Sequence, residues 1–315
     1  MSYELDPELI PIMAELAKQA AGIQPAARGD WQTLRANGNA GQAAMAALVP
    51  PVTGVRTESL ATTARNGDSI ELRWYTTGDT NPGSAVVYAH GGGLVLGSLD
   101  TYNEVLSWYV AQTGVPFLSV GYRLAPEATG TDLAEDVFAG LLWLHEHAGE
   151  LGVDPARVAI MGDSGGGAPA AGAVLLAREN HVPVARQILV YPMLDDRNQT
   201  ADEARTAFLT WNYDMNYTAW YALLGDQLGS DEVSPIAAPG RLTDFSGLPP
   251  AYIDVGDLDI FRDESIAYAQ NLARAGVPIE LHVHPGAPHG WERFAPHSGV
   301  GSRAMNDRAR AVSSL

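Results

Sequence analysis

From Ala85 onward, short apolar runs alternate with stretches that have the length and spacing of helices. We expect strands at residues 85–89, 116–120, 157–161, 187–191, 251–255 and 279–283, and helices at 102–113, 132–151, 164–180 and 263–275. Short strands without polar alternation are typical of parallel sheets that are buried on both faces by crossover helices. The pattern therefore predicts an α/β fold with a mostly parallel central sheet and helices on both faces.

This rhythm is interrupted at two places in the chain. Residues 4–22 carry apolar side chains at helical spacing, and a polar stretch rich in Gly and Ala follows up to the break at Pro50 and Pro51. Strand patterns follow at residues 55–62 and 69–75, and the interval from Pro192 to Pro249 is longer than one crossover requires. We expect a cap segment at residues 1–50 and an α/β domain at residues 51–315. A cap insertion near residues 195–235 would form a lid with the N-terminal helix.

The composition restricts the class of partner. Lys and Arg number 19 against 37 for Asp and Glu, so the formal net charge is −18. A surface of that sign repels phosphate backbones, and no basic cluster overrides it, so we expect no nucleic-acid partner. The sequence has no cysteine, which excludes disulfides, zinc–thiolate sites and a cysteine nucleophile.

The sequence pattern also bears on membrane insertion and export. The first residues carry acids where a signal peptide would carry positive charge. No stretch approaches the ~20 apolar residues that a membrane span requires. We expect a cytoplasmic protein with no membrane span.

The most informative motif is Gly162-Asp163-Ser164-Gly165-Gly166, at the junction of a predicted strand and a predicted helix. A serine on a tight strand-to-helix turn needs small residues two positions away on either side, because the backbone is pinched there. The turn holds the hydroxyl above the sheet, at the N-terminus of the helix. We therefore predict that Ser164 is a nucleophile.

Two other classes of glycine-rich motif do not fit this context. A phosphate-binding P-loop requires Lys followed by Ser or Thr after its last glycine, and the single lysine of the chain is Lys18. Trypsin-like proteases share a Gly-Asp-Ser-Gly-Gly string, but they are all-β proteins with disulfides, and their His and Asp precede the Ser. The α/β flanks and the absence of cysteine exclude that class.

A serine nucleophile needs a base that is oriented by an acid. Of the eight histidines, His289 lies in the loop directly after the last predicted strand, and α/β sheets place their chemistry at this end of the strands. The acid is expected between the Ser and the His in chain order. Of the acids in that order, Asp257 and Asp259 lie in the loop after the strand at 251–255, and spacing alone does not separate them.

A third element of this chemistry is His90-Gly91-Gly92-Gly93, which follows the strand at 85–89. Consecutive glycines let backbone N–H groups approach a substrate oxygen closely. Fixed donors there stabilise the negative charge that develops in acyl transfer, and one donor is typically worth ~2.7–4 kcal/mol. We assign the N–H groups of Gly91, Gly92 and Gly165 to such an oxyanion hole.

Together these motifs resemble those of the hormone-sensitive-lipase-like (bacterial family IV) carboxylesterases, a branch of the α/β-hydrolase superfamily. The resemblance covers about residues 55–295. It rests on five blocks in order: the glycine loop at 90–97, Tyr-Arg-Leu-Ala-Pro-Glu at 122–127, the serine motif at 162–166, Asp-Ile-Phe-Arg-Asp-Glu at 259–264, and His-Gly at 289–290. The first Asp of the fourth block is the triad acid of the family. The resemblance thus selects Asp259 over Asp257 and implies a triad of Ser164, Asp259 and His289.

The chain departs from the family pattern at a few positions. Gly165 stands where the family usually has Ala, and we expect this to keep the backbone donor while allowing a looser turn. Gly121, residues 128–131 and Ile260 also differ, without removing a predicted catalytic group. We interpret Tyr122 and Arg123 as structural, with Arg123 tying a buried loop by hydrogen bonds.

The resemblance implies hydrolysis of small-molecule carboxylic esters of short to medium chain length through an acyl-enzyme, with no cofactor and no metal. It leaves a homodimer open, since many relatives dimerise through the sheet edge. An amidase or acyltransferase of the same fold shares the first half-reaction and remains an alternative. A non-catalytic ligand-binding relative is a further alternative, but such a protein is expected to have lost a triad member.

Five side chains are candidates for the substrate pocket. Leu94 directly follows the three glycines at 91–93, and Trp291 directly follows His-Gly at 289–290. Tyr213, Tyr217 and Trp220 belong to an aromatic segment in which tyrosines recur at helical spacing. Packing of a lid helix on its own core and a substrate-binding wall explain that spacing equally well.

Overall fold

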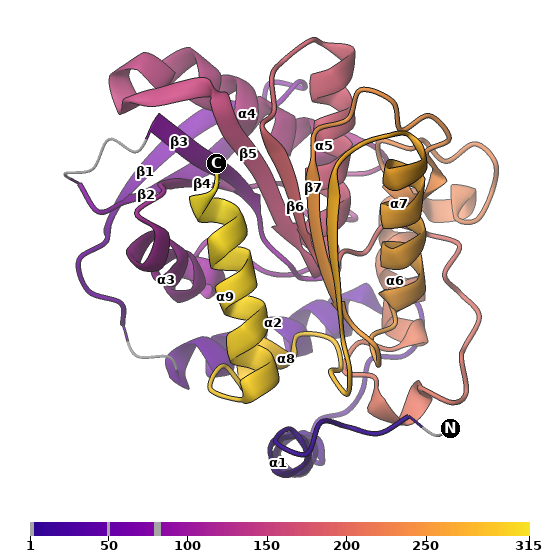
Figure 1. Cartoon of the computed structure of the whole chain (residues 1–315). Coiled ribbons are helices and arrows are strands. Elements are labelled where there is room, and N and C mark those ends of the chain that lie inside the picture. Colours follow the sequence, from indigo (N-terminus) through magenta and orange to yellow (C-terminus); the bar gives the residue numbers. More distant parts are fainter. Residues whose placement is uncertain (1–2, 49–50, 79–82) are drawn as a thin grey trace.

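The computed structural model describes residues 3–48, 51–78 and 83–315. An eight-stranded sheet forms the centre of this described chain, in the order β1-β2-β4-β3-β5-β6-β7-β8 (Figure 1). The antiparallel part comprises β1 (Arg56–Thr63), β2 (Ser69–Thr76) and the pairing of β2 with β4 (Phe117–Gly121). The remaining pairings are parallel and involve β3 (Gly83–Ala89), β5 (Val153–Asp163), β6 (Arg186–Val190), β7 (Ala251–Gly256) and β8 (Ile279–His284). The predicted mostly parallel sheet is confirmed.

Successive side chains of the central strands enter two different hydrophobic cores. Val87 of β3 lies in the core with α4 (Asp132–Leu151), α5 (Gly167–Glu179) and α7 (Arg262–Arg274). Tyr88 lies in the core with α3 (Asn103–Thr113), α8 (Trp291–Phe294) and α9 (Gly299–Ser313). Figure 1 shows α3 and α9 together on one face of the sheet. Because side chains of a strand point alternately to the two faces, burial of both sets requires helices on both sides, as predicted.

The N-terminal segment differs from the prediction. The helix expected at residues 4–22 is confined to α1 (Ile10–Ala20), with Pro11 in its first turn, where proline is tolerated. The stretch rich in Gly and Ala contains a further helix, α2 (Trp31–Leu48), which its weak helix formers concealed. Contacts with the rest of the fold stabilise α2: Arg35 donates to the carbonyl oxygen of Ala125 at 2.7 Å and to Glu127. The break predicted at Pro50 lies partly outside the described residues.

The interval after β6 holds α6 (Tyr213–Leu224) between irregular segments and short 3₁₀ turns. The N-terminal segment contacts α6 directly. Arg28 forms an ion pair with Asp214 at 3.0 Å, and the N–H of Gly29 donates to Thr218 Oγ1 at 2.8 Å. The two segments predicted to form a lid therefore lie against each other. No helix in the described ranges is long and apolar enough to cross a bilayer.

Candidate active site

Ser164 lies on a sharp turn between β5 and α5. Its φ of +51° is in the left-handed region, which a non-glycine residue adopts only when its surroundings enforce it. Its glycine neighbours permit this turn: a Cβ on Gly162 would lie 2.3 Å from the carbonyl oxygen of Gly166, and one on Gly166 would lie 2.2 Å from that of Ala89. The turn therefore has the geometry that the motif predicts.

Three of the predicted site residues form a continuous hydrogen-bonded chain. Ser164 Oγ lies 2.8 Å from His289 Nε2, and His289 Nδ1 lies 2.7 Å from Asp259 Oδ2. Asp259 is fully buried, and its other oxygen accepts the N–H of Phe261 at 2.9 Å, which fixes the carboxylate. Asp257 instead accepts the N–H of Gly286 at 2.7 Å and supports the loop before His289. The structure thus separates the two acids that spacing left equivalent.

The glycine loop lies directly against the serine turn. A Cβ on Gly165 would lie 2.3 Å from the backbone nitrogen of Gly93 and 2.6 Å from that of Leu94. The expectation of a looser turn at Gly165 is therefore wrong, because the missing methyl group is replaced by close backbone packing. Leu94 is fully buried with a φ of +68°, so it belongs to the strained loop itself.

Buried polar side chains form hydrogen bonds that hold the glycine loop and the serine turn. Tyr122 donates its hydroxyl hydrogen to the carbonyl oxygen of His90 at 2.6 Å, and its ring stacks on the imidazole. Burial lowers the pKa of His90 to about 4, so the ring is neutral near pH 7. Asp163 accepts the hydroxyls of Tyr88 at 2.7 Å and Tyr102 at 2.8 Å, and burial raises the pKa of this carboxyl.

The structural role predicted for Arg123 is confirmed. Its Nε and Nη2 donate to the two oxygens of buried Asp136 at 2.9 and 2.8 Å, and its backbone N–H also donates to this carboxylate. This bidentate pair anchors the loop after β4, which in turn carries Tyr122 beneath the glycine loop.

The insertion contacts Asp259, His289 and the glycine loop directly. Arg205 donates to the carbonyl oxygen of Asp259 at 2.8 Å, and Thr210 donates its hydroxyl hydrogen to that of His289 at 2.7 Å. The ring of Trp211 lies over Gly93, so close that a Cβ on this glycine would be 2.2 Å from Trp211 Cη2. No motif marks Arg205, Thr210 or Trp211, and the sequence features that point to this insertion are its length and its aromatic segment.

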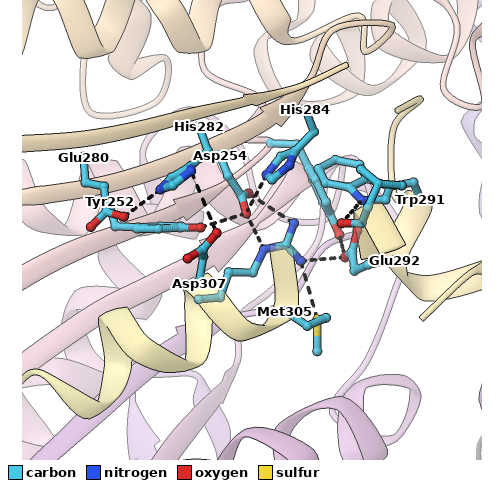
Figure 2. Close-up of polar contacts among 12 residues, drawn as sticks. Tyr252, Asp254, Glu280, His282, His284, Trp291, Glu292, Met305 and Asp307 are labelled. Atoms are coloured by element: carbon cyan, nitrogen blue, oxygen red, sulfur yellow. Dashed lines mark hydrogen bonds and ion pairs between the residues drawn. The ribbon is translucent and has the colours of Figure 1, made fainter. Parts of the chain in front are cut away.

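A buried charge network that includes Asp254 and Glu292 (Figure 2) lies next to Tyr191. Arg308 pairs with Asp254 at 2.6 Å and with Glu292 at 2.9 Å, and Glu292 accepts the hydroxyl of Tyr191. The ring of Tyr191 packs edge-on against His289, with centroids 4.7 Å apart. Burial and the charge of Glu292 raise the pKa of Tyr191, so the phenol stays protonated and donates. The network thereby holds one face of the imidazole.

The remaining predicted pocket residues divide into two groups. Trp291 and Trp220 are fully buried core residues, and the indole of Trp291 donates to the carbonyl oxygen of Val300 at 3.4 Å. This placement argues against a substrate-contacting role for either tryptophan.

The two tyrosines contact neighbouring segments of the cap. Tyr213 accepts the N–H of Asp202 at 3.1 Å. Tyr217 lines a surface groove of about 340 Å³ with Arg28, whose guanidinium lies 3.7 Å from its ring centroid.

The described residues contain no group of three or more His, Asp or Glu side chains arranged to hold a metal ion.

Comparison with known proteins agrees with this geometry. A family model described as the α/β hydrolase fold matches residues 86–293, which include the glycine loop, the serine turn and His289. The chain belongs to the α/β hydrolase family. The predicted resemblance to hormone-sensitive-lipase-like esterases is thereby confirmed at the level of the family.

Several relatives of this α/β hydrolase are esterases by name. It is 36% identical over 235 residues to "Esterase LipI" from Mycobacterium tuberculosis, covering 73% of this chain and 72% of the relative. It is 39% identical over 214 residues to "Carboxylesterase NlhH" from the same organism, covering 67% of each chain. Among solved structures, "Bacterial Heroin Esterase" superposes with a TM-score of 0.88 at 36% identity, covering 98% of this chain and 97% of that one.

Proposed function

We propose that this α/β hydrolase is a serine carboxylesterase that hydrolyses small carboxylic esters of short to medium chain length. The observation that carries the proposal is the uninterrupted chain from Ser164 Oγ through His289 to Asp259, with distances of 2.8 and 2.7 Å. The names of its relatives support the same class of reaction.

In the first half-reaction, Ser164 Oγ attacks the ester carbonyl carbon while its proton passes to His289 Nε2. Asp259 accepts the hydrogen bond from Nδ1 and stabilises the imidazolium that forms. The N–H groups of Gly91, Gly92 and Gly165 would hold the oxyanion. The tetrahedral intermediate then expels the alcohol, which takes the proton from His289, and leaves Ser164 acylated.

In the second half-reaction, His289 removes a proton from a water molecule, whose oxygen attacks the acyl carbon. The second tetrahedral intermediate collapses, the carboxylic acid leaves, and the proton returns to Ser164. The edge-on contact with Tyr191 and the hydrogen bond from Thr210 keep His289 and its loop in one orientation during both half-reactions.

We further propose that residues 1–50 and the insertion near 195–235 act together as a cap over Ser164. The contacts of Arg28 with Asp214 and of Gly29 with Thr218 support this pairing. The acyl group would lie beside Trp211, and the size of that ring favours short and medium chains. A cytoplasmic location and a homodimer remain predictions.

The test is hydrolysis of p-nitrophenyl esters from acetate to palmitate by the wild-type chain and by Ser164→Ala. We expect a maximum at short or medium chain length and a loss of roughly 10⁴–10⁶ in rate in the variant. Activity on an anilide series but on no ester would favour the amidase alternative. Equal rates for both proteins on every substrate would contradict the proposal.

A further inference from the structure

A second cavity lies on the face of the sheet that α3 and α9 cover. Its volume is about 480 Å³, and its walls come from the end of α2, from α3, from the segment containing α8, and from α9. Neither Ser164 nor His289 lines it. Asp163 and Tyr191 lie in its wall, so the cavity and the candidate active site are separated by a single layer of side chains. The volume is within the ~300–1,000 Å³ that small-molecule sites typically have.

Most of this wall is apolar or aromatic. Its apolar members include Met45, Val105, Trp108, Pro296 and Met305. Trp108 and Met305 come from α3 and α9, which lie side by side on this face (Figure 1). Such a surface favours an alkyl or aromatic body over a fully polar one.

The carboxylates in the wall of the cavity all have hydrogen-bond or ion-pair partners within the protein. Glu292 is paired with Nη1 of Arg308 at 2.9 Å, and the same nitrogen donates to Met305 Sδ at 3.8 Å. Asp163 accepts two tyrosine hydroxyls, as described above. Glu104 accepts the N–H of Val52 at 2.8 Å and the amide of Asn103 at 2.9 Å. Each carboxylate of the wall therefore already has donors within hydrogen-bond distance.

Arg293 also lines the cavity, but unlike these carboxylates it has only weak polar contacts within the protein. Its guanidinium lies 4.2 Å from the ring centroid of Tyr102, and its Nη2 donates to the carbonyl oxygen of Thr101 at 3.5 Å. In the part of the chain that the structure describes, no carboxylate lies within ion-pair distance of this side chain. A half-buried guanidinium with five donors and one long hydrogen bond can still bind a carboxylate in a bidentate manner.

We propose that this cavity is a binding site for a monocarboxylic acid with an alkyl or aromatic body. The carboxylate binds Arg293, and the body packs against Val105, Trp108 and Met305. The site is distinct from the one that holds the ester, and it does not depend on the proposed reaction.

The experiment is isothermal titration of 4-phenylbutyrate into the chain, before and after treatment with diethyl p-nitrophenyl phosphate. This reagent phosphorylates an activated serine and so blocks the candidate active site. We expect the acid to bind the treated protein, and the neutral 4-phenylbutanamide to bind at least about tenfold more weakly. If Ser164 does not take up the reagent, the proposed function fails, while the variants below still test the cavity.

Two variants address the cavity directly. Arg293→Gln should weaken binding of the acid at least about tenfold, and Val105→Trp should abolish binding by filling the space. Arg310→Gln is the matched control, since Arg310 lies on the outer surface of α9 in an ion pair with Glu280 and should leave binding unchanged. Thermal unfolding establishes that each variant is folded.

Three results would overturn the proposal. They are no detectable binding to the treated protein, equal affinity of Arg293→Gln and the wild-type chain, and equal affinity for the acid and the amide.

Discussion

The α-carbon of Gly165 packs so closely against the backbone of Gly93 that a Cβ at position 165 would lie 2.3 Å from the Gly93 nitrogen. This contact joins the serine turn to the glycine loop, the two segments to which we assign the oxyanion donors. Since the contact is between backbone atoms, no side-chain rotation can relieve an added methyl group.

Gly165→Ala should therefore displace the glycine loop and lower kcat at least about tenfold, as expected when oxyanion donors are misplaced. Steady-state kinetics on p-nitrophenyl butyrate measures the effect. Gly149→Ala is the matched control, because a Cβ at this position on α4 meets nothing within 4 Å. Full activity of Gly165→Ala would show that the loop adapts without cost.

Asp259→Asn should reduce kcat by up to about 10⁴, because the amide cannot stabilise the imidazolium and favours the wrong tautomer of His289. Asp257→Asn makes the same chemical change two residues earlier, at a carboxylate that binds the N–H of Gly286, and should retain most activity. Kinetics of both variants across the pH range separates the two acids. Equal losses would refute the assignment of Asp259.

Trp211→Ala should move the optimum of the p-nitrophenyl ester series towards longer acyl chains, because the indole fills the space over Gly93. The free energy of unfolding should fall as well, since Trp211 is only 8% exposed. The ratio of kcat/KM values for octanoate and acetate is the measurement. An unchanged ratio would remove Trp211 from the acyl site.

Trp291→Ala should act differently, because Trp291 is fully buried and packs edge-on against Tyr191. We expect it to lower the free energy of unfolding by about 3–5 kcal/mol, as large-to-small core substitutions of tryptophan do. Urea unfolding measures this loss. A folded, equally stable variant with an altered ester profile would restore the pocket role that the sequence suggested.

His90 should make the fold sensitive to acid. Burial lowers its pKa to about 4, whereas the unfolded residue titrates near 6.5, so the unfolded chain binds the additional proton between these values. The contribution of neutral His90 to the free energy of unfolding is complete above about pH 6.5. This contribution falls by on the order of 3 kcal/mol as the pH decreases towards 4. Burial lowers the pKa of His284 in the same sense, whereas it raises the pKa of Asp163 and so opposes the effect.

Urea unfolding between about pH 4 and 7 checks this sign. The free energy of unfolding of His90→Asn should depend less steeply on pH than that of the wild-type chain. His181→Asn is the control, since His181 is an exposed residue with a φ of +57°, a conformation that Asn tolerates. Identical slopes for wild type and His90→Asn would contradict the prediction.

Much of the fold could be predicted because its signals are local. The helix at Asp132–Leu151 has the predicted bounds, and the strand before Ser164 follows from its apolar run and the glycines after it. The sequence does not predict α2, because its Gly and Asn residues have weak helical propensity. Contacts such as that of Arg35 with the carbonyl oxygen of Ala125 stabilise this helix instead.

In the candidate site, too, residues within local motifs could be predicted, and residues placed by tertiary contacts could not. Ser164 and His289 lie in motifs whose position relative to a strand can be identified from the sequence. The contacts of Arg205, Thr210 and Trp211 depend on how a long insertion folds back over the sheet, and no local pattern encodes that path. The place of Trp291 after His289 suggests a pocket residue, but α8 directs this side chain into the core.

The central claim is that Ser164 carries the acyl group during turnover. The most direct measurement is acid quenching of a reaction with p-nitrophenyl acetate, followed by peptide mass spectrometry. We predict a mass increase of one acetyl group on the peptide that contains Ser164, and none in Ser164→Ala. Ester hydrolysis without acetylation of that peptide, or with the acetyl group on another residue, would contradict the account.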